Sequence, residues 1–450
     1  MRSELGNDPA HAPTAESPPP VTEGQVVQAW WPLAASWILM AVEQPLLAIV
    51  VARLANPEVN LAAWGGVVFP LALLIEAPVI MMLAASTALS RDRASYRALR
   101  RITHGLGFLL TVAHILLAFT PLYDIVVGGW MGIPDRVLIP GQIGLMIMTL
   151  WTWAIASRRF NQGILIRFGH SRAVGVGTAV RLVASTCVFM TGLWYQSISG
   201  IIVASTAVVV GVLVEAVYIA WRVRPDVQNN LAEDTDDAPL TGWKFAQFYF
   251  PLSMTVVIPL LARPLGSSAI ARMPLAVASL AVWPVIEGLV FVLQAGGIAY
   301  NEVVIAHLER PNARAVLRRV AWSLAVAIIC TCILLAATPI AQWWFHSVNN
   351  LPERLASMAS AAIWFALPVP ILRPFQSWFQ GVLVHVRKTR AITESVGVFF
   401  VIAIGMLWSG VHYGFASGLI VTLSAFALGY LGQTTWLWVR SRPYIAALPS

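Results

Sequence analysis

Charge and cysteine are both scarce in this chain of 450 residues. Only 11% of the residues are Asp, Glu, Lys or Arg, and only two are lysine. The three cysteines, Cys187, Cys330 and Cys332, have neither the spacing of a metal site nor that of a disulfide framework. The G-x-x-x-x-G-K-[ST] sequence of ATP-binding loops is also missing. These absences argue against a soluble domain, a metal centre, a cofactor-dependent enzyme and an ATP-driven pump.

Apolar residues are what the chain has in abundance. Hydrophobic residues make up 58% of it, and the mean hydropathy is +0.73. Apolar windows of about 20 residues, enough to cross a bilayer as a helix, recur along the whole length. The sequence therefore predicts an all-α polytopic membrane protein with twelve transmembrane helices. The expected spans are 28–51, 60–88, 102–120, 138–157, 173–193, 199–221, 245–266, 273–299, 320–338, 357–382, 391–409 and 415–438.

Polar segments divide these spans into two sets of six. Residues 1–25 include HAPTAESPPP and are predicted to be a disordered cytoplasmic tail rather than a cleaved signal peptide. A polar, acidic linker at 222–244 separates an N-lobe (26–221) from a C-lobe (245–439). Residues 440–450 form a second cytoplasmic tail.

The distribution of basic residues predicts the orientation. With the amino terminus inside, the inner segments hold 22 of the 29 Lys and Arg residues, and the outer loops hold four: Arg53, Arg136, Arg272 and Arg354. Because basic residues accumulate in cytoplasmic loops, both termini are expected in the cytoplasm. The arginine-rich composition favours a bacterial inner (plasma) membrane. The net charge of +8 fits contact with anionic lipid headgroups and does not require a nucleic acid partner.

The second half of the chain repeats the first. A shift of 219 residues aligns the first spans of the two halves, and a shift of 218 aligns later segments. The aligned pairs are Pro32 with Pro251, Pro45 with Pro264, Trp64 with Trp283, Arg100 with Arg318, Gln162 with Gln380, and Gly163 with Gly381. Since six helices are an even number, the two pseudo-symmetric bundles are related by an axis along the membrane normal. Transporters of this kind bind cargo between their repeats and alternate access by rocking the lobes.

The repeat places an acid and a base at equivalent positions. Glu43 and Gln44 precede Pro45 in the first span, and Arg263 precedes Pro264 in the seventh. A charge in the middle of a span is costly and is a functional hypothesis by default. The prolines can kink each helix and free carbonyls for polar contacts. We therefore predict that Glu43 and Arg263 face the space between the lobes and belong to one polar site.

Five more charged residues lie inside the predicted spans. Arg373, Glu76 and Glu287 are candidate substrate-binding or coupling residues, together with Gln44 and the pair above. Arg181 and Glu215 are expected to neutralise each other within the first lobe.

Short motifs resemble a known group of exporters. The paired FNQGIL and FQGVL segments, in two halves joined by a central linker, resemble the multidrug/oligosaccharide-lipid/polysaccharide (MOP) exporter superfamily. AVEQPLLAIVVA, SRDRASYRAL and LARPLGSSAIAR are similar to stretches of its progressive ankylosis protein family. The resemblance implies a MATE-like twelve-helix exporter of small anions such as pyrophosphate, citrate or nucleotides. It carries over Glu43, Gln44 and Arg263 as site residues.

Several functions remain open from the residues alone. The leading hypothesis is a monomeric secondary transporter that exports anionic cargo, with Arg263 and Arg373 holding the cargo's oxygens. A multidrug (cation) antiporter, in which Glu43 and Glu76 bind cationic cargo or a coupling ion, H+ or Na+, is the first alternative. A lipid-linked sugar flippase is the second. A non-transporting scaffold or receptor would need an extramembrane partner surface, and the loops are short.

Overall fold

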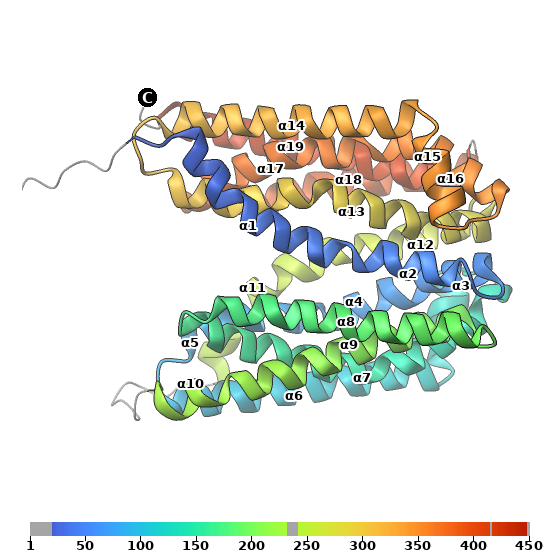
Figure 1. The fold of residues 1–450 in the computed structure, drawn as a ribbon, viewed down its shortest axis with the longest axis horizontal. Helices are drawn as coiled ribbons and strands as arrows, with labels where there is room; N and C mark the ends of the chain where they lie inside the picture. The colour runs from blue at the N-terminus through green and yellow to red at the C-terminus, as the bar shows by residue number, and fades with distance from the viewer. Residues whose placement is uncertain (1–19, 232–241, 415, 448–450) are drawn as a thin grey trace, which may run out of the picture.

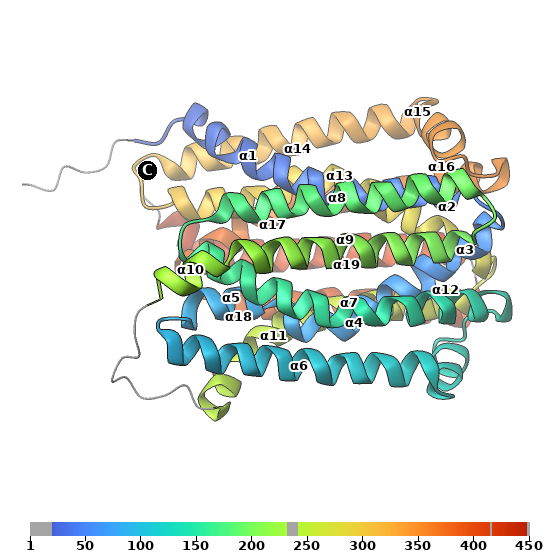
Figure 2. The same cartoon turned by 60° about the horizontal axis from the view of Figure 1, so that its bottom comes forward.

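The computed structural model describes residues 20–231, 242–414 and 416–447, and within them every regular element is a helix. Eleven helical segments of the described chain are long and apolar enough to cross a membrane. α19, with 29 residues, runs beside them as the twelfth long helix (Figures 1 and 2). The predicted all-α membrane fold is confirmed.

The first half of the chain contains ten α-helices and two π-helices, η1 and η2. They are α1 (Glu23–Ala41), α2 (Glu43–Val51), α3 (Pro57–Ala63), η1 (Trp64–Val68), α4 (Phe69–Ile80), α5 (Met82–Leu89), α6 (Arg93–Phe119), η2 (Asp124–Trp130), α7 (Asp135–Arg167), α8 (Ser171–Tyr195), α9 (Gly200–Arg222) and α10 (Arg224–Asn229).

The second half follows the same order. Its elements are α11 (Gly242–Leu260), α12 (Ala262–Ala271), α13 (Ala276–His307), α14 (Ala313–Ala337), α15 (Ile340–Gln342), η3 (Trp343–Val348), α16 (Glu353–Ala366), α17 (Pro368–His385), α18 (Arg390–Tyr413) and α19 (Gly418–Ala446). We call α2–α10 the first lobe and α12–α19 the second lobe. The start of α1, the helix α10 and the end of α19 all lie at the same end of the molecule (Figure 1).

Three predicted boundaries differ from the structure. Val21 is buried, its N–H donates to the Pro311 carbonyl at 3.1 Å, and α1 begins at Glu23, so helical structure starts before residue 26. A capping box between Thr22 and Gln25 fixes this start. The linker 222–244 contains α10, whereas 232–241 lies outside the described residues. The segment 440–446 continues α19 instead of forming a separate tail.

The repeat seen in the sequence is visible in the backbone. The first span breaks at Val42 and the seventh at Leu261, which are equivalent positions under the shift of 219. Under the shift of 218, Thr120 and Thr338 end equivalent helices with nearly identical backbone angles. Gly163 packs against Leu83 and Ser86, and its equivalent Gly381 packs against the equivalents of those two residues. The two halves therefore share local geometry as well as helix order.

The π-helix η1 explains why the shift changes from 219 to 218. A π turn accommodates one residue more than the α-helical turn it replaces. η1 lies at Trp64–Val68 in the second span, and the matching stretch of α13 is regular α-helix. The extra residue of the first half is thus absorbed within η1, and all later residues align with the shorter spacing.

The first part of each repeat crosses to the opposite lobe. α1 packs mainly on α13, and α11 packs mainly on α4 (Figure 1). The Trp30 indole N–H donates to the Gly296 carbonyl at 2.8 Å, and the Tyr249 hydroxyl donates to the Pro78 carbonyl. Trp30 and Tyr249 are equivalent residues, and so are Pro78 and Gly296, because the shifts of 219 and 218 relate them. Although residues 26–41 were assigned to the N-lobe from sequence, α1 lies on the second lobe.

Candidate functional site

Glu43 lies in a buried ion network within the first lobe. It is the first residue of α2, immediately after the break at Val42, and is 6% exposed. Its Oε2 pairs with Arg181 Nη2 of α8 at 3.1 Å, and its Oε1 accepts a hydrogen bond from Ser185 at 3.1 Å. Both partners stand on one face of α8, one turn apart. The carboxylate is therefore fully engaged inside its own lobe.

The network continues to α7 and α9. Arg181 Nε lies 3.8 Å from Glu215 Oε2, which also pairs with Arg158 of α7. Gln162 donates to the other oxygen of Glu215 at 3.0 Å. Arg181 and Glu215 lie together, as the sequence predicted, but they belong to a larger chain of charges that runs from α2 through α8 and α9 to α7. Such a chain gives each of these buried charges at least one partner of opposite charge.

Glu76 is the least satisfied carboxylate of the first lobe. It lies on α4, is 4% exposed, and its Oε2 has no hydrogen-bond partner among the described residues. Arg158, Arg159 and Arg181 lie close enough to act on it electrostatically. Three glutamates and three arginines thus share the interior of this lobe, so the formal charges cancel.

Arg263 lies in a second polar group, where the two lobes meet. Arg263 Nη1 of α12 pairs with Glu287 Oε2 of α13 at 2.6 Å. The guanidinium carbon lies 5.5 Å from the ring centre of Phe69, a residue of the first lobe, in cation–π geometry. Phe69 stacks on Trp64 at 5.4 Å, and the Trp64 indole donates to Gln44 Oε1 at 3.4 Å. These contacts link Gln44 of α2 to Glu287 across the lobe boundary.

The prediction that Glu43 and Arg263 share one polar site is wrong, because the two side chains have different partners. Equivalent positions share a depth in the membrane, but depth does not fix the direction in which a side chain points. Glu43 turns to α8, and its neighbour Gln44 turns to Trp64 and the lobe boundary. Arg263 is the equivalent of Gln44 rather than of Glu43, so it is Gln44 that shares the interlobe group with Arg263.

Close packing accompanies this group. A side chain at Gly65 of η1 would overlap the Pro284 ring of α13, and one at Gly288 would lie 3.3 Å from Pro45. Small residues permit such approach of helices in a membrane. The second-span segment and α13 thus form the tight contact between the lobes.

Arg373 stands apart from both groups. It lies on α17, where its Cβ and Cγ are 3.1 Å from the position a Cβ would take at Gly297 of α13. Its Nη1 donates to Gln376 Oε1 at 3.1 Å, and its Nε has no hydrogen-bond partner among the described residues. No described carboxylate lies within 4.0 Å of its guanidinium group.

The second lobe lacks the ion network of the first. Gln376 and Gln433 occupy the positions equivalent to Arg158 and Glu215. Gln376 donates to the Thr434 hydroxyl at 2.9 Å, and Gln433 lies 3.5 Å from the Ser395 hydroxyl. The same packing site is therefore ionic in one lobe and neutral in the other.

Sequence reasoning missed Arg158 and Arg159. Both were counted in a loop after a span ending at residue 157, but α7 continues to Arg167 and carries them into the lobe. Glu215 was the available signal: the sequence pairs this buried glutamate with Arg181 alone, although the structure gives it Arg158 as well. Arg158 and Arg159 add to Arg181, Arg263 and Arg373, so these five arginines stand against the four glutamates Glu43, Glu76, Glu215 and Glu287.

Solved structures of MOP-superfamily transporters share this fold. An inward-facing multidrug resistance MATE family transporter superposes with a TM-score of 0.74 at 14% identity, covering 90% of this chain and 95% of the other. The lipid II flippase MurJ in an inward closed conformation gives 0.72 at 13% identity, covering 93% and 87%. An outward-facing multidrug resistance MATE family transporter gives 0.61 at 14% identity, covering 95% and 97%.

No protein-family model and no curated protein sequence matches the chain. The MATE-like fold expected from the motifs is confirmed. The ankylosis-type subgroup stays a prediction.

Proposed function

We propose that this protein is a secondary transporter that moves small polyvalent anions across the membrane by alternating access of its two lobes. Candidate cargoes are pyrophosphate, citrate and nucleotide-like anions, and the direction is export. Arg373 and Arg263 would hold the cargo's oxygens through charge-assisted hydrogen bonds, to which guanidinium groups are well suited.

The charge of Arg373 carries this proposal. In the first lobe three arginines balance three glutamates, and at the lobe boundary Arg263 is balanced by Glu287. Arg373 is half-buried, its Nε has no acceptor, and no carboxylate of the described residues neutralises it. A charge inside a membrane span without a counter-charge is costly, which supports a functional role. A ligand that supplies the missing negative charge would satisfy it.

The alternating movement finds support in the helix breaks. α1 and α11 lie on opposite lobes from α2 and α12, and the breaks at Val42 and Leu261 connect the two parts. A charged residue lies close after each break, Glu43 directly after Val42 and Arg263 two residues after Leu261. Bending there changes both the lobe contacts and the placement of these charges.

In this proposal the coupling ion, H+ or Na+, binds in the first lobe. Glu76 has a carboxylate oxygen free of hydrogen bonds, and Glu43 lies next to a break. The same observation favours a second candidate function, a multidrug (cation) antiporter in which these two carboxylates bind the cargo or the exchanged ion.

Counterflow in proteoliposomes separates the two candidates. Vesicles preloaded with unlabelled pyrophosphate, citrate or an organic cation dye are diluted into the labelled compound. We expect accumulation of labelled anion and none of the dye. Uptake of the dye alone would make the anion proposal wrong and the antiporter correct.

A variant pair tests the role of Arg373. Arg373→Gln removes the charge and should lower anion counterflow at least about tenfold, the effect of losing about 1.4 kcal/mol of binding. Arg373→Lys keeps the charge and should retain part of the activity. Arg387→Gln is the matched control, because Arg387 follows the end of the same helix and its side chain is exposed. Equal activity of all three variants would remove Arg373 from the site.

A further inference from the structure

A groove in the second lobe combines three arginines with three tryptophans. It has a volume of about 470 Å³ and lies between the beginning of α14, the middle of α17 and the end of α19. Its lining includes Arg314, Arg318, Arg442, Trp322, Trp378 and Trp438. It lies at the end of the molecule where α19 terminates, away from the contact between the lobes (Figure 1).

The arginines of this groove are not neutralised by the protein. Arg314 donates only to the Ala446 carbonyl, at 3.4 Å, and Arg442 lies over the Trp438 ring at 4.9 Å. No ion pair joins Arg314, Arg318 or Arg442 to a carboxylate in the described chain, whereas their neighbour Arg319 pairs with Glu23 at 2.8 Å. Three guanidinium groups in one groove therefore attract an anion.

Trp378 gives an independent indication of a ligand. This side chain is 6% exposed, lines the groove, and its indole N–H has no acceptor among the described residues. A buried donor without an acceptor costs free energy, so an acceptor is expected at this point. A phosphate or glycerol oxygen held by the arginines would provide one.

The tryptophans identify the source of the phosphate. Trp322 and Trp438 are 56% and 46% exposed, and tryptophan concentrates where a protein meets the boundary between lipid and water. Trp322 packs edge-on against Phe375, which extends the apolar wall of the groove along the helices. A lipid places a charged headgroup beside an acyl chain, which matches arginines beside an apolar wall. Free phosphate would leave that wall uncovered.

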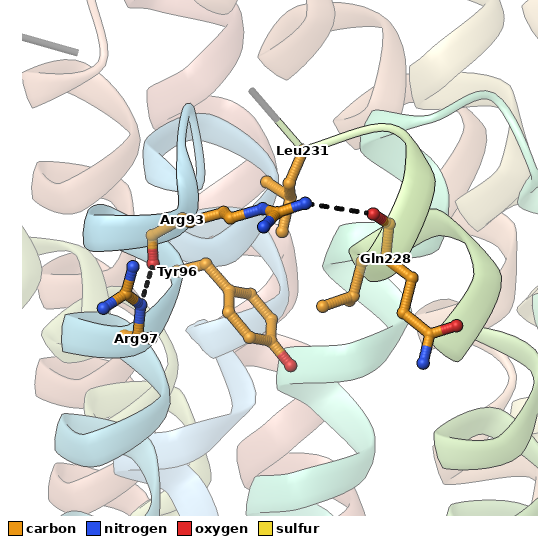
Figure 3. A pocket seen from close by; sticks show the side chains of 6 residues that line it. Arg93, Tyr96, Arg97, Gln228 and Leu231 are labelled. Atoms are coloured by element: carbon orange, nitrogen blue, oxygen red, sulfur yellow. Dashed lines mark hydrogen bonds between the residues drawn. The ribbon is translucent and has the colours of Figure 1, made fainter. Parts of the chain in front are cut away.

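The equivalent place in the first lobe provides a contrast. Figure 3 shows a smaller pocket, of about 290 Å³, between the beginning of α6 and α10. The shift of 218 relates Tyr96 to Arg314 and Gln228 to Ala446, and Arg93 donates to the Gln228 carbonyl at 3.2 Å, as Arg314 does to Ala446. This pocket has no tryptophan in its lining. The two lobes have thus kept the same place but differ in what it can hold.

We infer that the second-lobe groove is a binding site for one anionic phospholipid, with the phosphate at Arg314, Arg318 and Arg442 and the chain along Trp322 and Phe375. The site is separate from the proposed transport pathway. Its lipid would join the start of α14 to the end of α19.

The test measures lipid binding to the full-length protein in a neutral detergent. The protein is titrated with phosphatidylglycerol, phosphatidylcholine, glycerol 3-phosphate and inorganic phosphate. Native mass spectrometry counts the bound molecules, and the thermal midpoint of unfolding is measured in parallel. We expect saturable binding of one phosphatidylglycerol and a raised midpoint. The other three compounds should give at least about tenfold weaker binding.

Two variants locate the site. Arg318→Gln with Arg442→Gln should weaken phosphatidylglycerol binding at least about tenfold, and Trp378→Phe should weaken it severalfold. Arg319→Gln, which removes the same charge from the same helix outside the groove, should leave it unchanged. Equal binding of phosphatidylglycerol to the double variant and the control would overturn the proposal. So would equal affinity for glycerol 3-phosphate or for phosphatidylcholine.

Discussion

Arg158 and Glu215 form an ion pair in the interior of the first lobe, with side chains only 7% and 1% exposed. The pair joins α7 to α9 and holds the far end of the network that begins at Glu43. Replacing one partner takes the shortest contact away from the other buried charge, which costs far more than the pair itself contributes. The second lobe solves the same packing with Gln376 and Gln433.

The double replacement should therefore be milder than either single one. Arg158→Gln and Glu215→Gln alone are expected to destabilise the protein by about 3–5 kcal/mol. Together they remove both charges, so neither is left without its main partner, and the double variant should recover part of that loss. The thermal midpoint in detergent, followed by size-exclusion chromatography, measures all three. A double variant as unstable as the worse single variant would contradict this explanation.

Glu43 and Arg263 should act independently on stability, because each has its own partner. The effects of Glu43→Gln and Arg263→Gln are expected to add within about 0.5 kcal/mol. Glu43→Gln combined with Arg181→Gln should depart from additivity, since those two side chains pair directly. Denaturation midpoints of the single and double variants provide both cycles. Strong coupling of Glu43 with Arg263 would restore the shared site that the structure argues against.

α1 and α11 should be held less firmly on the opposite lobe when their hydrogen bonds to it are removed. Trp30→Phe and Tyr249→Phe each delete one hydrogen bond to the opposite lobe, worth about 1 kcal/mol. Spin labels at Val27 and Glu309 should show a broader distance distribution in Trp30→Phe than in the parent. Trp31→Phe serves as the control because Trp31 is exposed. An unchanged distribution in Trp30→Phe would mean that the bond does not hold α1 in place.

The close approach at Gly65 should be required for transport. Gly65→Ala places a methyl group in the Pro284 ring and forces the lobes apart at this contact, and counterflow should fall at least about tenfold. Gly175→Ala is the matched control in the same lobe, since nothing lies within 4 Å of its added carbon. Both changes gain the same helix propensity, so their difference isolates the clash. Equal counterflow in the two variants would show that the contact can open freely.

Hydropathy and self-similarity were sufficient to predict the helical class and the repeat, because both depend on residue type and spacing alone. They also placed Glu43 and Arg263 on equivalent helices of the two halves, next to equivalent breaks. They did not give the direction of these side chains, which follows from the break at Val42 and from the packing of α8. The position of Arg158 inside the lobe was not predicted, because a charged residue lowers the local hydropathy and the predicted span therefore ends too early. The first-lobe pocket and the second-lobe groove could not be predicted either, because each combines residues from segments far apart in the sequence.

The exchange of α1 and α11 between the lobes has a consequence for biogenesis. α1 is synthesised first, yet its main packing surface on α13 emerges only after the whole first lobe and the linker have been made. Until then its apolar face must be sheltered by lipid or by the insertion machinery. A ribosome that stops before α11 would leave α1 without the surface of α13 on which it packs, and α4 without the cover that α11 provides. The first lobe therefore reaches its final packing only after the helices of the second lobe have been inserted into the bilayer.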